Sequence, residues 1–502
     1  MSGNLSQDLS QEQGSPITNQ LPLVEELIPC PDLEQLLLEF AGEESLLVLD
    51  SARQSSLQGH YSYLMCNPLT RTQIQTAELG SDPFALMREV QARHQVESIP
   101  GLPPFQGGFA GLLSYELGRC WEEFPRASQD EFQLPDFAVG FYDWVIAWDH
   151  QQHRAWLIVQ GFEPSLNSQQ YELATQRSQS VKARIDAVLF DRSTRINHRP
   201  LQNLEPPLPR EALSSAFPLE GYPHIFSNFS KVEFQKRVAK IIEYIYAGDI
   251  FQANFSHRLL SPTTTHPVEL YLNLRAKNPA PFGGYSGWDD WAVLSASPER
   301  FLNVSDNEVE TRPIKGTRRR KYVPEADLLT RDELRESEKD QAENVMIVDL
   351  LRNDLSRVCQ PGSIRVPQLC SVETYETVQH LVSEVRGQLK PDQTVWDLLA
   401  AAFPGGSITG APKVRAMEII AELEPTVRGP YCGCLFYAGL NGEFDSNILI
   451  RTFTVRKGWI QFPVGGGIIA QSQPRLEYEE TLHKAAGMIA ALQNHTTASE
   501  NV

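Results

Sequence analysis

The chain has 502 residues, which at roughly 150 residues per domain would make about three compact units. Its composition, 41% hydrophobic and 21% charged, excludes a wholly disordered or fibrous protein. The formal net charge of −19 argues against a broad surface for nucleic acid or an anionic membrane. No apolar run of about 18 residues and no signal-peptide pattern occurs, so we expect a cytoplasmic protein without membrane spans. The 7 cysteines form no CxxC pair, which predicts reduced thiols and no zinc site.

The first part of the chain divides into a polar terminus and a region of short apolar runs. Residues 1–20 have a composition typical of disorder, and 21–196 form the first predicted region. Strands are predicted there at 46–49, 108–114 and 144–148. A surface helix is predicted over 171–188. A Pro-rich connector at 197–224 separates this region from the next.

The second region, 225–495, mixes helices with consecutive strands. Apolar residues at helical spacing from Phe234 to Ile245 predict a helix that ends at Gly248. Further helices are predicted at 332–355, 413–423 and 475–492. Strands are predicted at 250–259, 291–295, 434–440, 448–455 and 459–464. This order favours an α+β or mixed α/β fold over an alternating parallel sheet.

Two of the predicted helices carry acidic side chains at helical spacing. Asp340 and Glu343 are three residues apart, and Glu477, Glu480 and Lys484 follow the same face of the last helix. Two such helices facing each other could hold a hard cation, and oxygen-only ligands suit Mg²⁺. Solvated Glu–Lys helix faces are the simpler interpretation of either helix alone.

Two glycine-rich segments could bind anions. The segment 405–413 lacks the Lys and the Ser or Thr of a P-loop, but it leads into a helix with Pro412 at its predicted first position. Exposed N–H groups at such a turn suit a carboxylate or a phosphate. The second segment, Val464–Ile468, is equally consistent with a tight strand-to-loop turn.

A basic segment, 311–321, contains one lysine in a distinctive setting. Pro313 restricts the backbone before Lys315, and Gly316 allows a sharp bend after it. The nearby cations Arg312 and Arg318 would lower the pKa of Lys315, and an amine must be neutral to act as a nucleophile. A solvated basic loop is the alternative.

Several blocks in one order give the sequence a resemblance to the chorismate-utilising enzymes. They are Arg312–Thr317, Asp340–Leu350, Gly406–Lys413, Gly465–Ile468 and Glu477–Thr481. The match spans about 232–492, and 107–119 and 47–51 match more loosely. The resemblance implies one interwoven α/β unit with two antiparallel sheets packed face to face, helices outside, and the site in a cleft.

Two positions bear on the member of the family. Members that add water to the ring carry a lysine base where this sequence has Gln252, which cannot accept a proton from water. Anthranilate synthases carry alanine where this sequence has Lys315, and aminodeoxychorismate synthases carry lysine there. The resemblance therefore implies amination of chorismate at C4 through attack of Lys315 at C2, with anthranilate synthesis as the alternative.

The resemblance also assigns roles to residues. It implies catalysis by Lys315, Glu299 as general acid, and His380 near the reacting ring. It implies Mg²⁺ ligation by Glu343 and Glu480, with Asp340 and Glu477 completing the cage. The implied substrate-binding residues are Gln252, Thr317, Thr409, Tyr437, Arg451, Gly465, Gly466, Gly467 and Lys484.

The implied partners are chorismate and a source of ammonia. No nucleophilic cysteine elbow of a glutaminase occurs, so ammonia would come from solution or from a separate glutamine amidotransferase subunit. The segment Leu49–Ser51 is a weak match to the tryptophan pocket of the family, and a plain strand end is the alternative. A non-catalytic subunit that binds chorismate or tryptophan is the rival from another functional class.

Overall fold

The computed structural model describes residues 22–53, 58–94, 96–162, 167–190, 206–321, 323–375 and 378–493. The segment predicted to be disordered, 1–20, and part of the predicted connector lie outside these ranges. None of the helices within the described ranges is both long enough and apolar enough to cross a membrane. All 7 cysteines are free thiols.

Antiparallel strands form two sheets in the described part of the chain. The first sheet contains, in spatial order, β1 (Leu23–Glu26), β8 (Arg154–Val159), β7 (Trp144–Asp149), β3 (Tyr61–Met65), β2 (Leu47–Asp50), β12 (Phe282–Gly287), β13 (Trp291–Ser297), β22 (Thr452–Arg456), β23 (Trp459–Ile468), β11 (Gln252–Pro262), β10 (Tyr222–Ser227) and β9 (Phe217–Leu219), with β19 (Gly410–Ala411) beside β11. The second contains β16 (Ile314–Arg319), β18 (Val378–Gln388), β15 (Glu308–Thr311), β14 (Arg300–Ser305), β21 (Phe444–Asn447), β20 (Cys434–Gly439), β5 (Gly108–Leu113), β6 (Phe137–Tyr142) and β4 (Thr70–Ile74), with β17 (Arg365–Thr374) beside β18. Strands from the first and second predicted regions hydrogen-bond to each other in both sheets.

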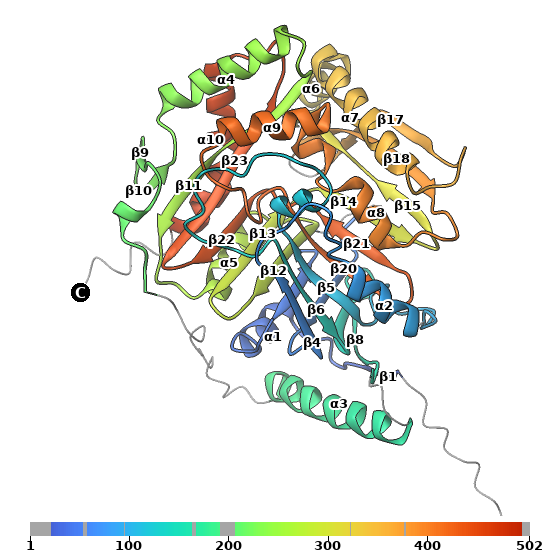
Figure 1. Ribbon diagram of the computed structural model, residues 1–502. Helices are drawn as coiled ribbons and strands as arrows, with labels where there is room; N and C mark the ends of the chain where they lie inside the picture. The colour runs from blue at the N-terminus through green and yellow to red at the C-terminus, as the bar shows by residue number, and fades with distance from the viewer. Residues whose placement is uncertain are drawn as a thin grey trace, which may run out of the picture.

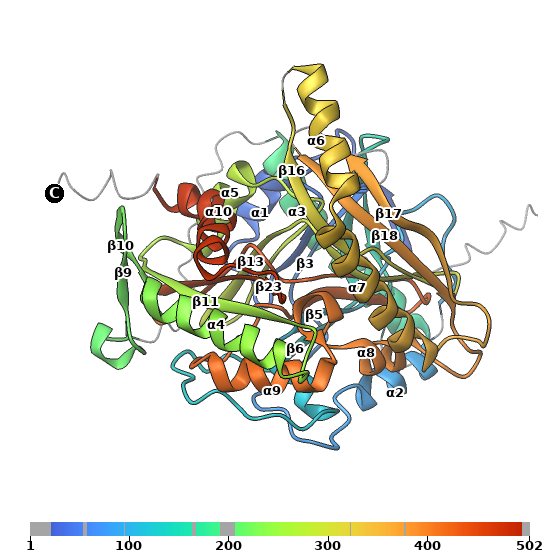
Figure 2. The same ribbon diagram turned by 90° about the horizontal axis from the view of Figure 1, so that it is seen from above.

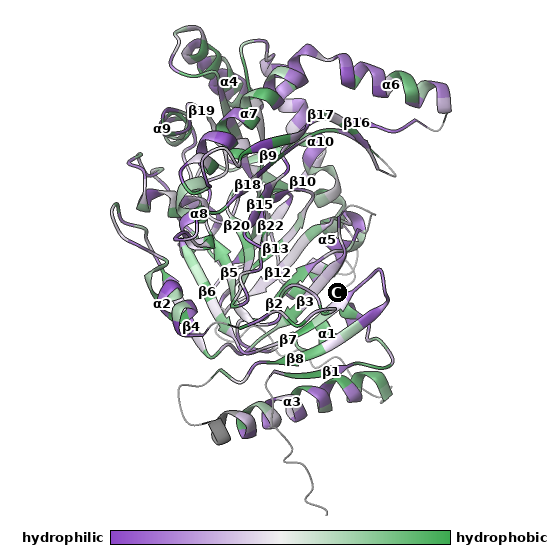
Figure 3. Ribbon diagram, turned by 90° about the vertical axis from the view of Figure 1, so that its right-hand side faces the viewer, coloured by the Kyte–Doolittle hydropathy of each residue, from purple (hydrophilic) through white to green (hydrophobic). Residues whose placement is uncertain are grey.

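Helices cover the outer faces of the sheets. They are α1 (Leu33–Glu39), α2 (Ala85–Arg93), α3 (Asn167–Phe190), α4 (Lys231–Tyr246), α5 (Pro267–Lys277), α6 (Pro324–Glu336), α7 (Glu338–Ser356), α8 (Val395–Ala402), α9 (Lys413–Leu423) and α10 (Pro474–Gln493). Figure 1 shows α4 and α9 at one end of the molecule and α3 at the other. Helix α6 projects from the body in Figures 2 and 3.

The cores follow from this layering. One apolar cluster joins inward-facing side chains of both sheets, such as Val293 and Leu435, and strands such as β5 and β6 are correspondingly hydrophobic in Figure 3. A second cluster lies between the first sheet and α1, α3, α5 and α10, and a third packs α2, α7 and α8 against the second sheet. The expected architecture of two antiparallel sheets face to face with helices outside is confirmed.

Local sequence explains most helix boundaries. Helix α4 begins with a capping box between Ser230 and Glu233, and it buries Phe234, Val238 and Ile241. The single helix predicted over 332–355 is wrong, because α6 and α7 are separate helices. Ser337 between them has an extended backbone, and its side chain accepts a hydrogen bond from the Asp340 N–H.

Three further local predictions are corrected. The segment Val464–Ile468 is part of the long strand β23 instead of a strand-to-loop turn. The predicted strand 448–455 begins only at Thr452, because Arg451 has a φ of 52° that interrupts extended backbone. Pro412 is the N-cap of α9 and not its first residue.

Candidate active site

Strand β16 carries Lys315 past the N-terminal part of α7. The register between β16 and β18 shifts between Lys315 and Thr317, and Gly316 in the shift has a φ of 62°. A Cβ on Gly316 would lie 2.8 Å from Leu334 Cδ1 and 2.9 Å from Asp340 Cγ. The sharp bend predicted at Gly316 is therefore present, and it allows β16 to pass directly against α6 and α7.

Lys315 and Glu299 are connected through one serine. The Lys315 ammonium donates to the Ser407 carbonyl at 3.3 Å, and the Ser407 hydroxyl donates to Glu299 Oε1 at 3.1 Å. Ser407 lies in the 3₁₀ helix η3 (Gly406–Ile408), within the glycine-rich segment noted in the sequence. This segment thus places a serine between the amine and the acid, a role that the sequence analysis missed.

Burial shifts both groups toward their uncharged forms. It lowers the pKa of Lys315, while the carboxylates of Glu299 and Glu343 oppose that shift. It raises the pKa of Glu299, a side chain that is 8% exposed, while the Lys315 cation opposes that shift. A neutral amine can act as a nucleophile, and a protonated carboxyl can give a proton to a leaving group.

Carboxylates of α7 and α10 face each other near this pair. The Lys339 ammonium lies 3.9 Å from Glu343 Oε1 and 4.0 Å from Glu477 Oε1, so one cation already lies between the two helices. Lys484 pairs with Glu480 Oε1 at 2.8 Å and donates to the Gly465 carbonyl at 2.9 Å. The predicted helix faces are therefore directed at each other and not only at solvent.

The pKa shifts of these acids reflect crowding. Burial and neighbouring carboxylates raise the pKa values of Glu343 and Glu477, although nearby lysines oppose the shift. Burial alone would raise the pKa of Glu480 as well, but the ammonium groups of Lys484, Lys339 and Lys315 together outweigh it and hold that pKa below its usual value. A bound cation would relieve the repulsion within this group.

The acidic group fits a sparsely ligated hard cation and not a closed cage. No three His, Cys, Asp or Glu side chains in the described part of the chain are arranged to hold one ion. Asp340, a predicted ligand, accepts a hydrogen bond from Arg318 at 3.0 Å. A Cβ on Gly466 would lie 3.2 Å from Lys484 Nζ, 3.6 Å from Glu480 Oε1 and 3.9 Å from Glu477 Oε2, so the glycine lets β23 pass close to the lysine and to both carboxylates. Mg²⁺ commonly binds one or two carboxylates and completes its shell with water and substrate oxygens.

A cationic group lies on the β18 side of Lys315. His380 on β18 is opposite Thr317 in the register, and burial with the charges of Arg451 and Arg53 lowers its pKa to about 4. Burial, together with Arg53, lowers the pKa of Arg451. The structure brings together the predicted His380 and Arg451, and adds Arg53 from the first region. Arg53 belongs to no motif, so the sequence carried no signal for it.

Other predicted substrate-binding residues have defined places. Thr409 is fully buried, and its hydroxyl donates to the Gly405 carbonyl at 3.0 Å within the turn. Gly465, Gly466 and Gly467 pair with β11. Thr317 lies on β16, but its side chain is outside what the structure describes.

Gln252 begins β11 and is completely buried. Neither its side-chain oxygen nor its side-chain nitrogen has a hydrogen-bond partner within the described residues. A Cβ on Gly467 would lie 2.8 Å from Gln252 Nε2, so the carboxamide packs directly over the glycine strand. An orphaned buried amide is costly, and a bound polar ligand would satisfy it.

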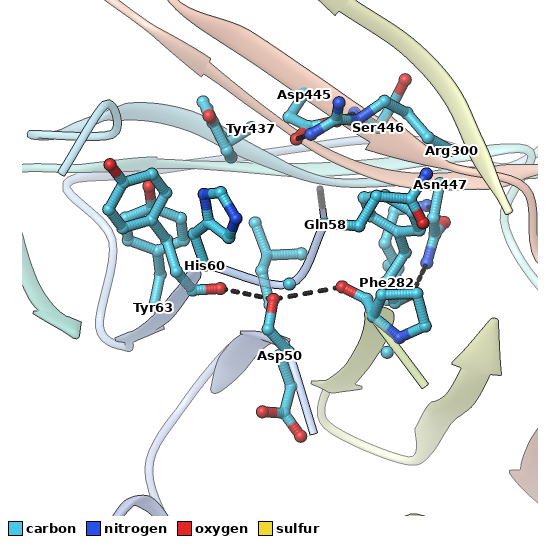
Figure 4. Close-up of a pocket in the computed structure, with 17 residues that line it drawn as sticks. Asp50, Gln58, His60, Tyr63, Phe282, Arg300, Tyr437, Asp445, Ser446 and Asn447 are labelled. Carbon is cyan, nitrogen blue, oxygen red and sulfur yellow. Dashed lines mark hydrogen bonds and ion pairs between the residues drawn. The ribbon is translucent and has the colours of Figure 1, made fainter. Parts of the chain in front are cut away.

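Tyr437 does not lie with the other predicted residues. It lines a cavity of about 120 Å³ between the sheets, together with Tyr63, Phe282 and Asn447 (Figure 4). The predicted segment Leu49–Ser51 lines the same cavity. Ser51 donates to the carbonyls of Tyr61 at 2.7 Å and of Pro281 at 3.1 Å. The tryptophan site and the contact of Tyr437 with the substrate both stay predictions.

Comparisons with known proteins agree with this geometry. A model of the family described as chorismate binding enzyme matches residues 47–490. Aminodeoxychorismate synthase component 1 of Klebsiella aerogenes is 39% identical over 416 residues, which cover 83% of this chain and 84% of that protein. Anthranilate synthase component 1 of Streptomyces coelicolor is 38% identical over 459 residues, which cover 91% and 85%. The crystal structure of anthranilate synthase component I from Streptococcus pneumoniae matches with a TM-score of 0.70 and 28% identity, covering 87% of this chain and 93% of that one. The chain therefore belongs to the chorismate binding enzymes.

Proposed function

We propose that this protein is the chorismate-aminating component of an aminodeoxychorismate synthase, which replaces the C4 hydroxyl of chorismate by an amino group. The observation that carries the proposal is the Lys315–Ser407–Glu299 connection, an amine and a carboxyl of shifted pKa joined through one residue. An amine at this position offers the covalent route to C4 that an alanine could not. The relatives named as aminodeoxychorismate synthases support the same assignment.

In the first step, the neutral amine of Lys315 attacks C2 of the ring. A C–N bond forms at C2, the two conjugated ring double bonds each shift by one position toward C4, and the C4–O bond breaks. Glu299 gives its proton to the departing hydroxyl, which leaves as water. Burial supports both roles, since it favours the uncharged amine and the protonated acid.

In the second step, ammonia attacks C4 of the adduct. Both ring double bonds return to their original positions and the bond from C2 to the lysine nitrogen breaks, which releases Lys315. The lysine leaves as the neutral amine it was at the start, and the proton that the attacking ammonia loses returns Glu299 to its protonated form. One displacement of hydroxide is thereby divided into two easier substitutions. We further propose that a separate glutamine amidotransferase supplies the ammonia, in keeping with the name component 1 of the relatives.

Glu343 and Glu480 are the residues that would hold Mg²⁺, with Glu477 beside them. When bound, the ion would neutralise and orient the ring carboxylate. Lys484 lies 2.8 Å from Glu480, and Lys339 lies within 4.0 Å of both Glu343 and Glu477, so these two lysines offset part of the negative charge of the acids.

The second candidate is anthranilate synthase component I, because relatives of that name are as similar as those named for the first activity. The products separate the two. We expect purified protein with chorismate, Mg²⁺ and ammonium to give a product that keeps the enolpyruvyl group and gains nitrogen at C4. Release of pyruvate together with anthranilate would refute the proposal and favour the alternative.

A further inference from the structure

Arg53 is a cation from the first region that lies near His380 and Arg451 of the second region. Its backbone N–H donates to the Ala280 carbonyl at 3.1 Å, which ties the end of the β2 segment to the segment before β12. Its guanidinium lies 5.5 Å from the centre of the Tyr375 ring. That ring in turn packs edge-on against His380, with the ring centres 5.5 Å apart. A chain of contacts therefore leads from Arg53 to the predicted site.

The charges of this group are unbalanced. Arg53 Nη2 is shielded from water and has no hydrogen-bond partner in the described part of the chain. Arg451 sits at the kink before β22, and neither arginine forms an ion pair with a described carboxylate. The Arg53 charge, after burial, lowers the pKa of Arg451, so the two cations repel each other, and an arriving anion would offset that repulsion.

Chorismate carries two carboxylates, one on the ring and one on the enolpyruvyl side chain. The acidic group of α7 and α10 would serve the ring carboxylate through a cation. We propose that Arg53 and Arg451 together bind the other carboxylate, so that a residue of the first region completes the substrate site. A guanidinium pair holds a carboxylate by charge and by directed hydrogen bonds. The inference rests on chorismate as substrate and not on which ring carbon is aminated.

The test is steady-state consumption of chorismate by the full chain at saturating ammonium and Mg²⁺, which does not depend on the product formed. For R53Q we expect KM for chorismate to rise about tenfold, as for loss of one charge-assisted hydrogen bond, with little change in kcat. R53K keeps the positive charge but not the planar guanidinium, so its KM for chorismate should lie between the values of the unmodified protein and R53Q. R93Q is the matched control, because Arg93 is an exposed arginine on α2 that pairs with Glu89.

A double variant sharpens the assignment. If both arginines hold one carboxylate, R53Q/R451Q should raise KM by less than the product of the single effects. A KM for R53Q within about twofold of the unmodified protein, with KM raised in R451Q, would overturn the role of Arg53. A fall in kcat at unchanged KM would overturn it as well. Should R53Q not fold, R53K carries the test, and an unchanged KM in that variant refutes the inference. The identity of the product is decided separately.

Discussion

Replacing Glu299 by glutamine tests the acid step. The amide has nearly the shape of the carboxyl, and its oxygen can still accept the hydrogen bond that Ser407 donates at 3.1 Å. The variant therefore removes the transferable proton and leaves the local contacts. The Lys315 amine keeps its contact with the Ser407 carbonyl at 3.3 Å.

The size of the effect follows from the buried position of Glu299. At 8% exposure, water can hardly replace the missing acid. General acid catalysis contributes about 10²–10⁴-fold, so kcat should fall by that factor, equal to about 3–5 kcal/mol in the barrier. KM for chorismate should change little, because no carboxylate of the substrate is assigned to Glu299.

The pH profile gives an independent readout. Burial raises the pKa of Glu299, so its protonated form persists to higher pH, and kcat should decline as pH rises through that pKa. The decline should be absent in E299Q. The acid side of the profile, where Lys315 must lose its proton, should remain, since burial lowers the pKa of that amine.

The assay is chorismate consumption over a pH series, with E89Q as control because Glu89 is exposed on α2 and pairs with Arg93. E299D, which keeps an acid on a shorter arm, should recover part of the rate. Retention of more than about a tenth of kcat by E299Q, with the alkaline decline unchanged, would refute the acid role.

Three further variants test other parts of the structure. E480Q should raise the Mg²⁺ concentration needed for half-maximal activity about tenfold or more. E479Q is the control, because Glu479 is on the same helix but pairs with Arg475 at 3.0 Å, and it should leave that concentration unchanged. Equal Mg²⁺ requirements in the two variants would exclude ligation by Glu480. Gln252→Met removes an amide with two unpaired buried atoms, so the free energy of unfolding in urea should rise by about 1–2 kcal/mol, and activity should fall. A lower free energy of unfolding would mean that the amide has hydrogen-bond partners in the folded protein. Glu131 pairs with Arg258 at 2.8 Å, and this pair overcomes the cost of burial and lowers the pKa of Glu131 to about 2. A lowered pKa stabilises the fold above the unfolded-state value of about 4.5, so about 3 kcal/mol should be lost as pH falls toward 2, and E131Q should lack that pH dependence; an unchanged dependence would argue against the pair.

Local sequence was sufficient to predict the bounds of an element where residues within that element determine its structure. Helix α9 has the predicted bounds, because an apolar face and a proline at its start act within the segment. The break at Ser337 was missed, since strong helix formers on both sides concealed one capping residue. The three glycines of β23 suggest a turn in isolation, but pairing with β11 along its whole length keeps them extended.

The site depended on tertiary contacts that spacing cannot reveal. Lys315, Glu299 and Ser407 come from three distant segments, and only the resemblance to a family placed two of them together beforehand. The sequence around Tyr437 could not show which residues surround it, because strand β20 places its side chain in the cavity between the sheets. Arg53 became visible only when β2 paired with β12 and brought the first region to the second.

The most direct test of the account is the search for a covalent adduct on Lys315. Protein is mixed with chorismate and Mg²⁺ without ammonia, quenched in acid, and measured as intact protein and as peptides by mass spectrometry. We expect a gain equal to chorismate less one water, located on the peptide that contains Lys315, and no gain in K315A. Absence of the adduct, together with formation of the 4-amino product by K315A at the unmodified rate, would contradict the proposed mechanism.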